Sequence, residues 1–258
     1  MTELVLVETM GDVSVVTLNN PRARNALSRE LLVQLADVLD ARRTDTACRA
    51  VVLTGAQGHF CSGGDVANMA TERPLPVGRE RMVIAQRVVR LMVDMGKPVV
   101  AAVEGYAAGA GLSLAMAADW VVASATAKFV SSFVKVGLLP DLGLMWTLPQ
   151  RIGLAQAKRL MLSARVVAAE EALRMGLIDE LCAAEQAVAR AKEVAAELSA
   201  HAPISAALLK NAYARGINQL SDALDFEMDN QAALYLTHDH REAVTAFLEK
   251  RTPNFRGV

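Results

Sequence analysis

The sequence predicts an α/β fold in which helices cover a largely parallel sheet. Two short apolar runs, residues 50–55 and 98–103, are rich in valine and alanine and show no alternation of apolar and polar side chains. Such runs are typical of strands that are buried on both faces, as in parallel sheets. The 258-residue chain is 53% hydrophobic but only 4% aromatic, which indicates an aliphatic, helix-rich core.

The first elements are predicted to be a β-hairpin and then a helix. Residues 4–7 and 13–18 are β-rich and flank a tight turn. Asn19-Asn20-Pro21 breaks this pattern, and from Ser28 onward apolar side chains recur at helical spacing. Residues 69–77 contain two prolines, so we expect a mobile surface loop there, ahead of another amphipathic helix.

Strand patterns give way to helical ones in the second half of the chain. A further strand is expected at residues 120–123 and a turn at residues 137–140. Helical patterns follow at residues 155–163, 168–175, 185–200 and 203–250. Because strand patterns cease near His201, we expect a core formed by residues 1–200 and a small helical region formed by residues 201–258.

The composition argues against several classes of protein. A formal net charge of −1 lacks the excess of lysine and arginine that nucleic-acid binders need. Cys48, Cys61 and Cys182 include no C-x-x-C pair, so no disulfide framework or metal site is indicated. The N-terminus lacks the features of a signal peptide, and Glu104 and three glycines interrupt the apolar stretch at residues 99–118. We therefore expect a cytoplasmic protein that binds no metal, nucleic acid or membrane.

The first of three segments that could carry chemistry is residues 58–66, directly after a buried strand. Its paired glycines, Gly63 and Gly64, permit a backbone shape that leaves amide N–H groups free to point at a ligand. A purely structural turn is the more common reason for paired glycines.

The second segment, residues 105–119, is a glycine-rich run that leads directly into an apolar helix. The amides at a helix N-terminus are unsatisfied and favour negative charge, so an oxyanion could bind there. The glycine spacing is not the G-x-G-x-x-G dinucleotide fingerprint. Close packing of the helix on the sheet would also explain these glycines.

The third segment, residues 136–146, is a turn in which Asp141 is surrounded by aliphatic side chains. Burial of this kind would raise the pKa of the carboxyl toward the range that suits a general base. The alternative is that Asp141 only caps the helix that follows.

In this order, the three segments resemble the crotonase superfamily, also called the enoyl-CoA hydratase/isomerase family, over essentially the whole chain. The resemblance also includes Leu18-Asn19-Asn20-Pro21 before Asn25-Ala26-Leu27, and the closing residues 246–251. It implies a spiral core of β-β-α turns and a C-terminal helical trimerisation region. It further implies an acyl-coenzyme A thioester substrate, no other cofactor, and a homotrimer or a dimer of trimers.

The resemblance implies roles for particular residues. The backbone amides of Gly64 and Ala110 would form an oxyanion hole for the thioester oxygen as it becomes an enolate. Arg22, Arg24 and Ala26 would lie near the adenine and phosphates of coenzyme A. Ordinary solvated charge remains the alternative for the two arginines.

Two residues near the C-terminus also take their implied role from the resemblance. Phe247 and Lys250 would reach a coenzyme A that is bound mainly by a neighbouring subunit. A place in the core of the terminal helix is the alternative for Phe247.

The sequence departs from the hydratase pattern at two positions. Hydratases of the family use two glutamates to activate water, and Ser113 and Phe133 stand at those positions. Asp141 remains, at the position where several isomerases of the family carry their acid. Residues 133–141 look like the branch typified by the phenylacetate-pathway isomerase. We therefore expect an isomerase that converts a 3-enoyl to a 2-enoyl thioester, with Asp141 shuttling the proton and Phe133 lining the substrate site.

Other functions stay open at this point. Within the family, the chain could be a hydratase with a displaced acid, another lyase, a thioesterase or a ring-forming isomerase. Ser113 could belong to a degraded nucleophile elbow of a serine hydrolase, although it is expected to lie inside a helix. A non-catalytic acyl-CoA-binding protein is the third possibility. His59 and Cys61 are expected to be structural, and His238-Asp239-His240 to cap a helix rather than to bind a metal.

Overall fold

The structure is a computed structural model that describes residues 3–65 and 74–258. The chain begins with the antiparallel hairpin of β1 (Val5–Met10) and β2 (Val13–Leu18), as the sequence predicts. The helix α1 (Arg29–Thr44) begins at Ser28, whose hydroxyl accepts a hydrogen bond of 3.1 Å from the amide of Leu31. This N-cap is the one that the spacing of apolar residues indicates.

The main sheet is parallel except for the hairpin, with strand order β1-β2-β3-β4-β6-β9. Its remaining strands are β3 (Ala50–Gly55), β4 (Val99–Val103), β6 (Trp120–Ser124) and β9 (Glu180–Cys182). A second, smaller sheet joins β5 (Tyr106–Ala108), β7 (Lys128–Val130) and β8 (Val167–Ala168). The buried, non-alternating runs at the centre therefore do form parallel strands.

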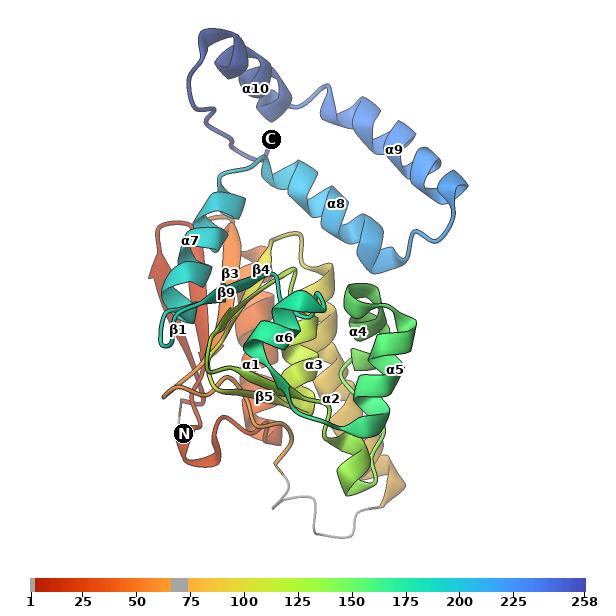
Figure 1. The fold of residues 1–258 in the computed structure, drawn as a ribbon. Helices are drawn as coiled ribbons and strands as arrows, with labels where there is room; N and C mark the ends of the chain where they lie inside the picture. The colour runs from red at the N-terminus through yellow and green to blue at the C-terminus, as the bar shows by residue number, and fades with distance from the viewer. Residues whose placement is uncertain (1–2, 66–73) are drawn as a thin grey trace.

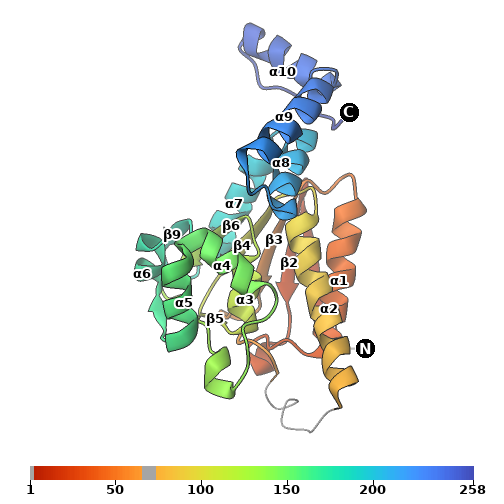
Figure 2. The same cartoon turned by 90° about the vertical axis from the view of Figure 1, so that its right-hand side faces the viewer.

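Helices cover both faces of the main sheet. On one face, Val52 and Val100 pack against α7 (Ala187–Ser199). On the other, Val51 and Ala101 belong to a larger apolar cluster with buried residues of the first three helices. The first two of these helices, α1 and α2, lie side by side next to the sheet (Figures 1 and 2). The further core helices are α2 (Leu75–Asp94), α3 (Ala110–Met116), α4 (Leu144–Ile152), α5 (Leu154–Ser163) and α6 (Ala169–Arg174).

The loop expected at residues 69–77 is only partly described. Residues 69–73 of it lie outside the described part of the chain, so the expectation of a mobile loop is untested there. The helix α2 already begins at Leu75, just after Pro74, so the loop ends earlier than the sequence suggests. Proline is well tolerated at a helix start because its missing amide has no intrahelical partner there.

Three C-terminal helices, α8 (Pro203–Arg215), α9 (Leu220–Leu234) and α10 (His238–Glu249), extend from one end of the core (Figure 1). The helix α8 is fixed to the core by Lys210, whose ammonium donates to the Lys97 carbonyl at 2.9 Å and to Asp119 at 2.5 Å. No residue of α9 is buried. The chain turns between α7 and α8 where the sequence suggests a boundary, and the division at residue 201 stays a prediction.

The capping of α10 differs from the expectation. Thr237 is the N-cap and accepts a hydrogen bond from the amide of His240, at 3.1 Å. Asp239 is buried and instead accepts hydrogen bonds from the amides of Arg256 and Gly257, which fixes the C-terminal tail. In the described ranges, no helix is both long enough and apolar enough to cross a membrane.

Candidate active site

The two glycine-rich segments lie side by side and are joined by backbone hydrogen bonds. The amide of Cys61 donates to the Tyr106 carbonyl at 2.9 Å, and the amide of Ala108 donates to the Cys61 carbonyl at 3.0 Å. These bonds form a short parallel bridge that aligns residues 60–64 with the turn before α3. Two segments more than 40 residues apart thus form one structural unit, which we call the glycine cradle (residues 61–64 and 107–111).

The contact between these segments leaves no room for side chains. A Cβ atom at Gly111 would lie 2.3 Å from the carbonyl oxygen of Cys61. At Gly63, where φ is +106°, a Cβ would lie 2.8 Å from the Ala108 carbonyl oxygen and 3.6 Å from the Ala110 nitrogen. A φ of that sign is disfavoured for residues with side chains. The glycines therefore serve close backbone approach, and they bring the Gly63-Gly64 turn beside the amide of Ala110.

Several backbone amides of the cradle have no acceptor among the described residues. The amides of Gly64 and Ala110 are two of them. The Ala110 amide is at the start of α3, where amides have no intrahelical partner, so it can donate to a ligand oxygen. This arrangement agrees with the expected oxyanion hole, although the role itself is untested.

The side chain of Asn25 holds the segment that leads into the cradle, a role that the sequence analysis did not assign. Its side-chain amide donates to the carbonyls of Ala56 at 3.0 Å and His59 at 2.6 Å. Leu27 then donates from its amide to the Gly63 carbonyl at 2.8 Å and pairs with Gly64 in an isolated bridge. The family-like Asn25-Ala26-Leu27 motif carried the only signal for this bracing.

Asp141 lies in the turn between the 3-10 helix η3 (Phe133–Val136) and α4. The residue is half-buried, and its Oδ1 atom is buried without a hydrogen-bond partner in the part of the chain that the structure describes. Burial raises the pKa of the Asp141 carboxyl to about 6, against the opposing charge of Arg81. The sequence-based expectation of a raised pKa therefore agrees with the structure.

The capping role for Asp141 is wrong. The N-cap of α4 is Gly143, and no side chain accepts a hydrogen bond at that helix start. The carboxyl group therefore does not cap α4, and its Oδ1 atom has no hydrogen-bond partner among the described residues. A half-buried acidic group with a raised pKa is typical of a functional site.

The Asp141 turn and the glycine cradle rest on common supports. The amide of Gly109 donates to the Val130 carbonyl at 2.8 Å, which joins the cradle to the strand before η3. On the other side of the turn, Leu142 and Leu144 are buried in the same apolar cluster as Ala110. The helix α4, which begins three residues after Asp141, packs against α3, the helix that begins with Ala110.

Neither hydratase position carries a carboxylate. Ser113 is fully buried inside α3, and its hydroxyl donates to the Gly109 carbonyl at 3.4 Å. A nucleophile elbow requires an exposed serine at a strand-to-helix turn, so the serine hydrolase alternative is wrong. Phe133 is buried at the start of η3.

Cys61 of the cradle is fully buried, and burial raises the pKa of its thiol to about 12, which agrees with a structural role.

The residues expected near coenzyme A fall into two places. Arg22 and Arg24 are exposed around the 3-10 helix η1 (Pro21–Ala23), and Ala26 is buried behind them. Ser62 of the cradle links to this segment, because its amide donates to the Arg24 carbonyl at 3.0 Å. The two arginines therefore stand at the rim of the cradle, with their ligand role untested.

Phe247 lies in α10 and Lys250 is the residue that ends this helix, at the other end of the molecule (Figure 1). The structure therefore does not bring them together with Arg22 and Arg24 in one chain. Phe247 is 82% exposed, so its alternative placement in the core of the terminal helix is wrong. A contact between these two residues and the coenzyme A of a neighbouring subunit remains a prediction.

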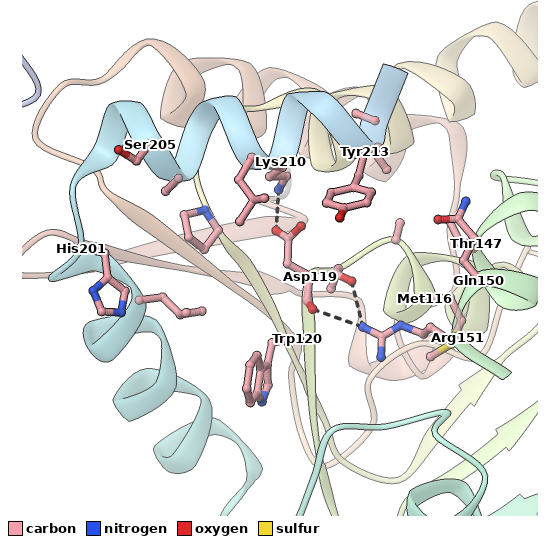
Figure 3. A pocket seen from close by; sticks show the side chains of 18 of the residues that line it. Met116, Asp119, Trp120, Thr147, Gln150, Arg151, His201, Ser205, Lys210 and Tyr213 are labelled. Atoms are coloured by element: carbon pink, nitrogen blue, oxygen red, sulfur yellow. Dashed lines mark hydrogen bonds and ion pairs between the residues drawn. The ribbon is translucent and has the colours of Figure 1, made fainter. Parts of the chain in front are cut away.

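The cavity shown in Figure 3 lies away from these groups. It has a volume of about 600 Å³ and lies beneath α8, next to Trp120, Arg151 and His201. None of the predicted site residues lines it. Its charged groups are already engaged, since Lys210 binds Asp119 and Arg151 donates to two backbone carbonyls. A second cavity of about 680 Å³ lies between α2, α4 and α8 and includes Gly143 of the Asp141 turn.

The described residues contain no group of three or more histidine, cysteine, aspartate or glutamate side chains that could hold a metal ion. The described part of the site offers one carboxyl group and the amides of Gly64 and Ala110. The carboxyl group can act as a general acid and base, and the two amides can donate hydrogen bonds to an oxygen that gains negative charge.

Comparison with known proteins indicates the family to which the chain belongs. The family model described as enoyl-CoA hydratase/isomerase matches residues 8–258. The chain is 35% identical over 249 residues to the short-chain-enoyl-CoA hydratase of Clostridium acetobutylicum, covering 96% of this chain and 95% of that relative. It is 37% identical over 261 residues to the 1,2-epoxyphenylacetyl-CoA isomerase of Escherichia coli, covering 100% of both.

Solved structures extend the likeness to the fold. The crystal structure of an enoyl-CoA hydratase from Polaromonas sp. JS666 matches with a TM-score of 0.93 at 33% identity, over 97% of this chain and 99% of that one. The glycine cradle, the helical C-terminal region and these full-length matches lead to one conclusion. The chain belongs to the enoyl-CoA hydratase/isomerase family, the crotonase superfamily of enzymes that act on acyl-CoA thioesters.

Proposed function

We propose that the enzyme is an enoyl-CoA isomerase that converts a 3-enoyl to a 2-enoyl thioester. The observation that carries this proposal is Asp141, a half-buried carboxyl with an unpartnered oxygen and a pKa raised to about 6. A group that titrates near neutral pH suits general acid–base catalysis. Ser113 and Phe133, which stand at the two hydratase positions, offer no carboxylate to activate water.

One carboxylate is sufficient for the reaction. Ionised Asp141 removes a proton from C2, and the electron pair of that bond moves toward the thioester carbonyl to form a dienolate. The amides of Gly64 and Ala110 donate to the oxygen that gains the negative charge. As the carbonyl re-forms, protonated Asp141 returns the proton to C4 and the double bond is left between C2 and C3. Loss of one such donor typically costs about 100- to 1,000-fold in rate.

The remaining predicted contacts concern the coenzyme A portion of the substrate. Arg22 and Arg24 suit its phosphates because both side chains are exposed at the rim of the cradle. Three copies of the chain would assemble through the C-terminal helices, which expose Leu220, Met228 and Phe247. The enzyme would need no metal or further cofactor and would act in the cytoplasm. Light scattering of the purified protein tests the trimer, and a monomer would contradict it.

Hydratase activity is the second candidate. Relatives that are named hydratases, among them the enzyme of Clostridium acetobutylicum, favour it. In this chain Asp141 would then have to activate water by itself, in an apolar turn. The 1,2-epoxyphenylacetyl-CoA isomerase of Escherichia coli matches over its full length, which favours isomerase chemistry instead.

Separate incubations with a 2-enoyl-CoA and a 3-enoyl-CoA distinguish the two candidates. We expect rapid conversion of the 3-enoyl substrate, which is measured by the absorbance of the conjugated thioester that forms. We expect slow or no addition of water to the 2-enoyl substrate. Water addition to the 2-enoyl substrate that is faster than isomerisation would defeat the proposal. Binding without either reaction would favour a non-catalytic acyl-CoA-binding protein.

A further inference from the structure

Ser132, the residue before η3, lies against the glycine cradle. Gly109 of the cradle has a φ of +51°, and a Cβ atom built there would lie 3.1 Å from the hydroxyl oxygen of Ser132. The same Cβ atom would lie 3.9 Å from the Cα atom of Gly63. The hydroxyl therefore borders the space that the missing side chain of Gly109 leaves open, and this space extends toward Gly63.

This space adjoins both residues that carry the proposed oxyanion donors. Gly109 directly precedes Ala110, and Gly63 directly precedes Gly64. A Cβ atom at Gly63 would lie 3.6 Å from the nitrogen of Ala110, so the two turns meet at this point. The Ser132 hydroxyl is thus placed beside the two glycines whose following amides are the proposed donors.

The hydroxyl of Ser132 has no structural use in the described part of the chain. A serine at the start of a helix usually accepts a hydrogen bond from an amide of the first turn. Ser132 is the N-cap residue of η3, but its side chain makes no such bond and has no other hydrogen-bond partner among the described residues. The residue is half-buried, which distinguishes it from a fully solvated surface serine.

A second serine beside Gly109 shows how a structural hydroxyl is bonded at this place. Ser113 is fully buried, and its hydroxyl donates to the Gly109 carbonyl at 3.4 Å. Around Ser132 only the backbone is bonded: its carbonyl accepts from the amide of Lys135 at 3.1 Å, and the Gly109 amide donates to the Val130 carbonyl at 2.8 Å. These bonds hold the Ser132 hydroxyl at the cradle and leave it free to donate.

We propose that Ser132 is a further catalytic residue, whose hydroxyl donates a third hydrogen bond to the thioester oxygen that the amides of Gly64 and Ala110 hold. This inference rests on the proposed function of those two amides as an oxyanion hole. A hydroxyl can rotate to donate, and its hydrogen bond strengthens when the acceptor oxygen gains the charge of the enolate. One segment of the chain then supplies both this donor and Asp141.

Two variants of Ser132 separate hydrogen-bond donation from packing. Ser132→Ala removes the donor, whereas Ser132→Cys keeps the shape of the side chain but offers only a weak S–H donor. Both should lower kcat with a 3-enoyl-CoA by about 3- to 30-fold. The change in KM should be smaller, because the hydrogen bond is strongest in the transition state. A loss in Ser132→Ala that is absent from Ser132→Cys would show a packing role and overturn the proposal.

Ser163→Ala is the matched control. It makes the same chemical change at the exposed end of α5, where the hydroxyl is bonded only to the neighbouring backbone of Leu160 and Arg165. It should leave kcat and KM unchanged. A kcat of Ser132→Ala that equals that of Ser163→Ala would also overturn the proposal.

A binding measurement keeps this test separate from the isomerase activity. Butanoyl-CoA labelled with carbon-13 at the thioester carbonyl has no double bond to move, so its NMR signal reports only the polarisation of the carbonyl. In the wild-type protein and in Ser163→Ala, we expect the signal of the bound carbonyl to lie downfield of that of the free thioester. In Ser132→Ala it should move back toward the free value.

The outcomes of this measurement distinguish the two proposals. A downfield signal that is unchanged in Ser132→Ala would overturn the third donor and leave the oxyanion hole of Gly64 and Ala110 in place. No downfield displacement in the wild-type protein would overturn both the hole and the third donor. A displacement that depends on Ser132, in a protein that isomerises no 3-enoyl-CoA, would support the third donor and overturn only the isomerase.

Discussion

The two halves of the site are built in opposite ways. The glycine cradle is held by several backbone hydrogen bonds and by contacts that exclude even a Cβ atom, as at Gly111. The Asp141 turn is flanked by exposed apolar side chains, Leu138 and Leu139, and it holds a carboxyl oxygen without a partner in the described chain. The glycine cradle is fixed by close backbone contacts. The Asp141 carboxyl is held where burial disfavours its charged form.

This difference explains how one fold supports several reactions. An oxyanion donor must be placed within a few tenths of an ångström, so its backbone tolerates little change. The acid–base group needs only a suitable pKa and reach, and both depend on local burial and charge. In this chain the proposed acid is Asp141, whereas residues 113 and 133 are uncharged.

The largest expected effect is that of removing the acid. The Asp141→Asn variant keeps the shape of the turn but cannot accept a proton, so isomerisation should fall by about 100- to 10,000-fold. Asp37→Asn, at an exposed position of α1 where only a surface ion pair with Arg87 is lost, is the matched control and should keep full activity. Initial rates with a 3-enoyl-CoA measure both. Unchanged turnover in Asp141→Asn would remove this residue from the mechanism.

Disturbing the cradle should have the next largest effect. In Gly111→Ala the new methyl group would meet the Cys61 carbonyl and displace the Ala110 amide, which we expect to lower kcat by about 10- to 100-fold. Gly78→Ala makes the same chemical change where nothing lies within 4 Å, and it should be nearly silent. Similar kcat values for the two variants would show that close approach at Gly111 does not matter.

The activity should depend on pH through Asp141. Because the ionised form is the base and its pKa is about 6, kcat/KM should be nearly constant above pH 7 and fall with unit slope below pH 6. At pH 5 a loss of about ten-fold is expected. A profile of kcat/KM from pH 5 to pH 8 measures this. A limb centred near pH 4 would mean that Asp141 is not held in an apolar setting.

The smallest effect concerns stability. The pKa of Asp141 is about 6 in the folded protein and near its ordinary value of 3.8 when the chain is unfolded. Between these values the folded state holds a proton that the unfolded chain has released, so stability is lost as the pH rises through this window. Asp141→Asn avoids that loss and should be more stable by about 1–2 kcal/mol at pH 8, with little gain at pH 4. Urea unfolding at both pH values measures this, and a gain independent of pH would contradict it.

Much of the fold follows from the sequence because burial leaves a direct pattern. The run at residues 50–55 lacks alternation since both of its faces are covered, and it is strand β3 with the same bounds. Short strands such as β8 (Val167–Ala168) have too few residues to show a period. For α4 the sequence indicates only that a helix follows Asp141, without bounds, because its Pro149 interrupts the usual helical signal.

Residues of the site could be predicted from the sequence only where a local sequence pattern marks them. Close backbone approach requires glycine, so Gly63 and Gly111 are visible in the sequence. The apolar neighbours of Asp141 likewise indicate its raised pKa. The role of Asn25 could not be found in this way, because its hydrogen bonds to the carbonyls of Ala56 and His59 form only once distant parts of the chain have come together.

Exchange of substrate protons in deuterated water tests the central role of Asp141 most directly. In the wild-type enzyme, a 3-enoyl-CoA should exchange at C2 and give a 2-enoyl product with deuterium at C4 in proportion to how often the Asp141 proton exchanges with solvent. In Asp141→Asn, both exchange and isomerisation should disappear while coenzyme A still binds. Exchange at C2 that continues at the wild-type rate in Asp141→Asn would contradict the account.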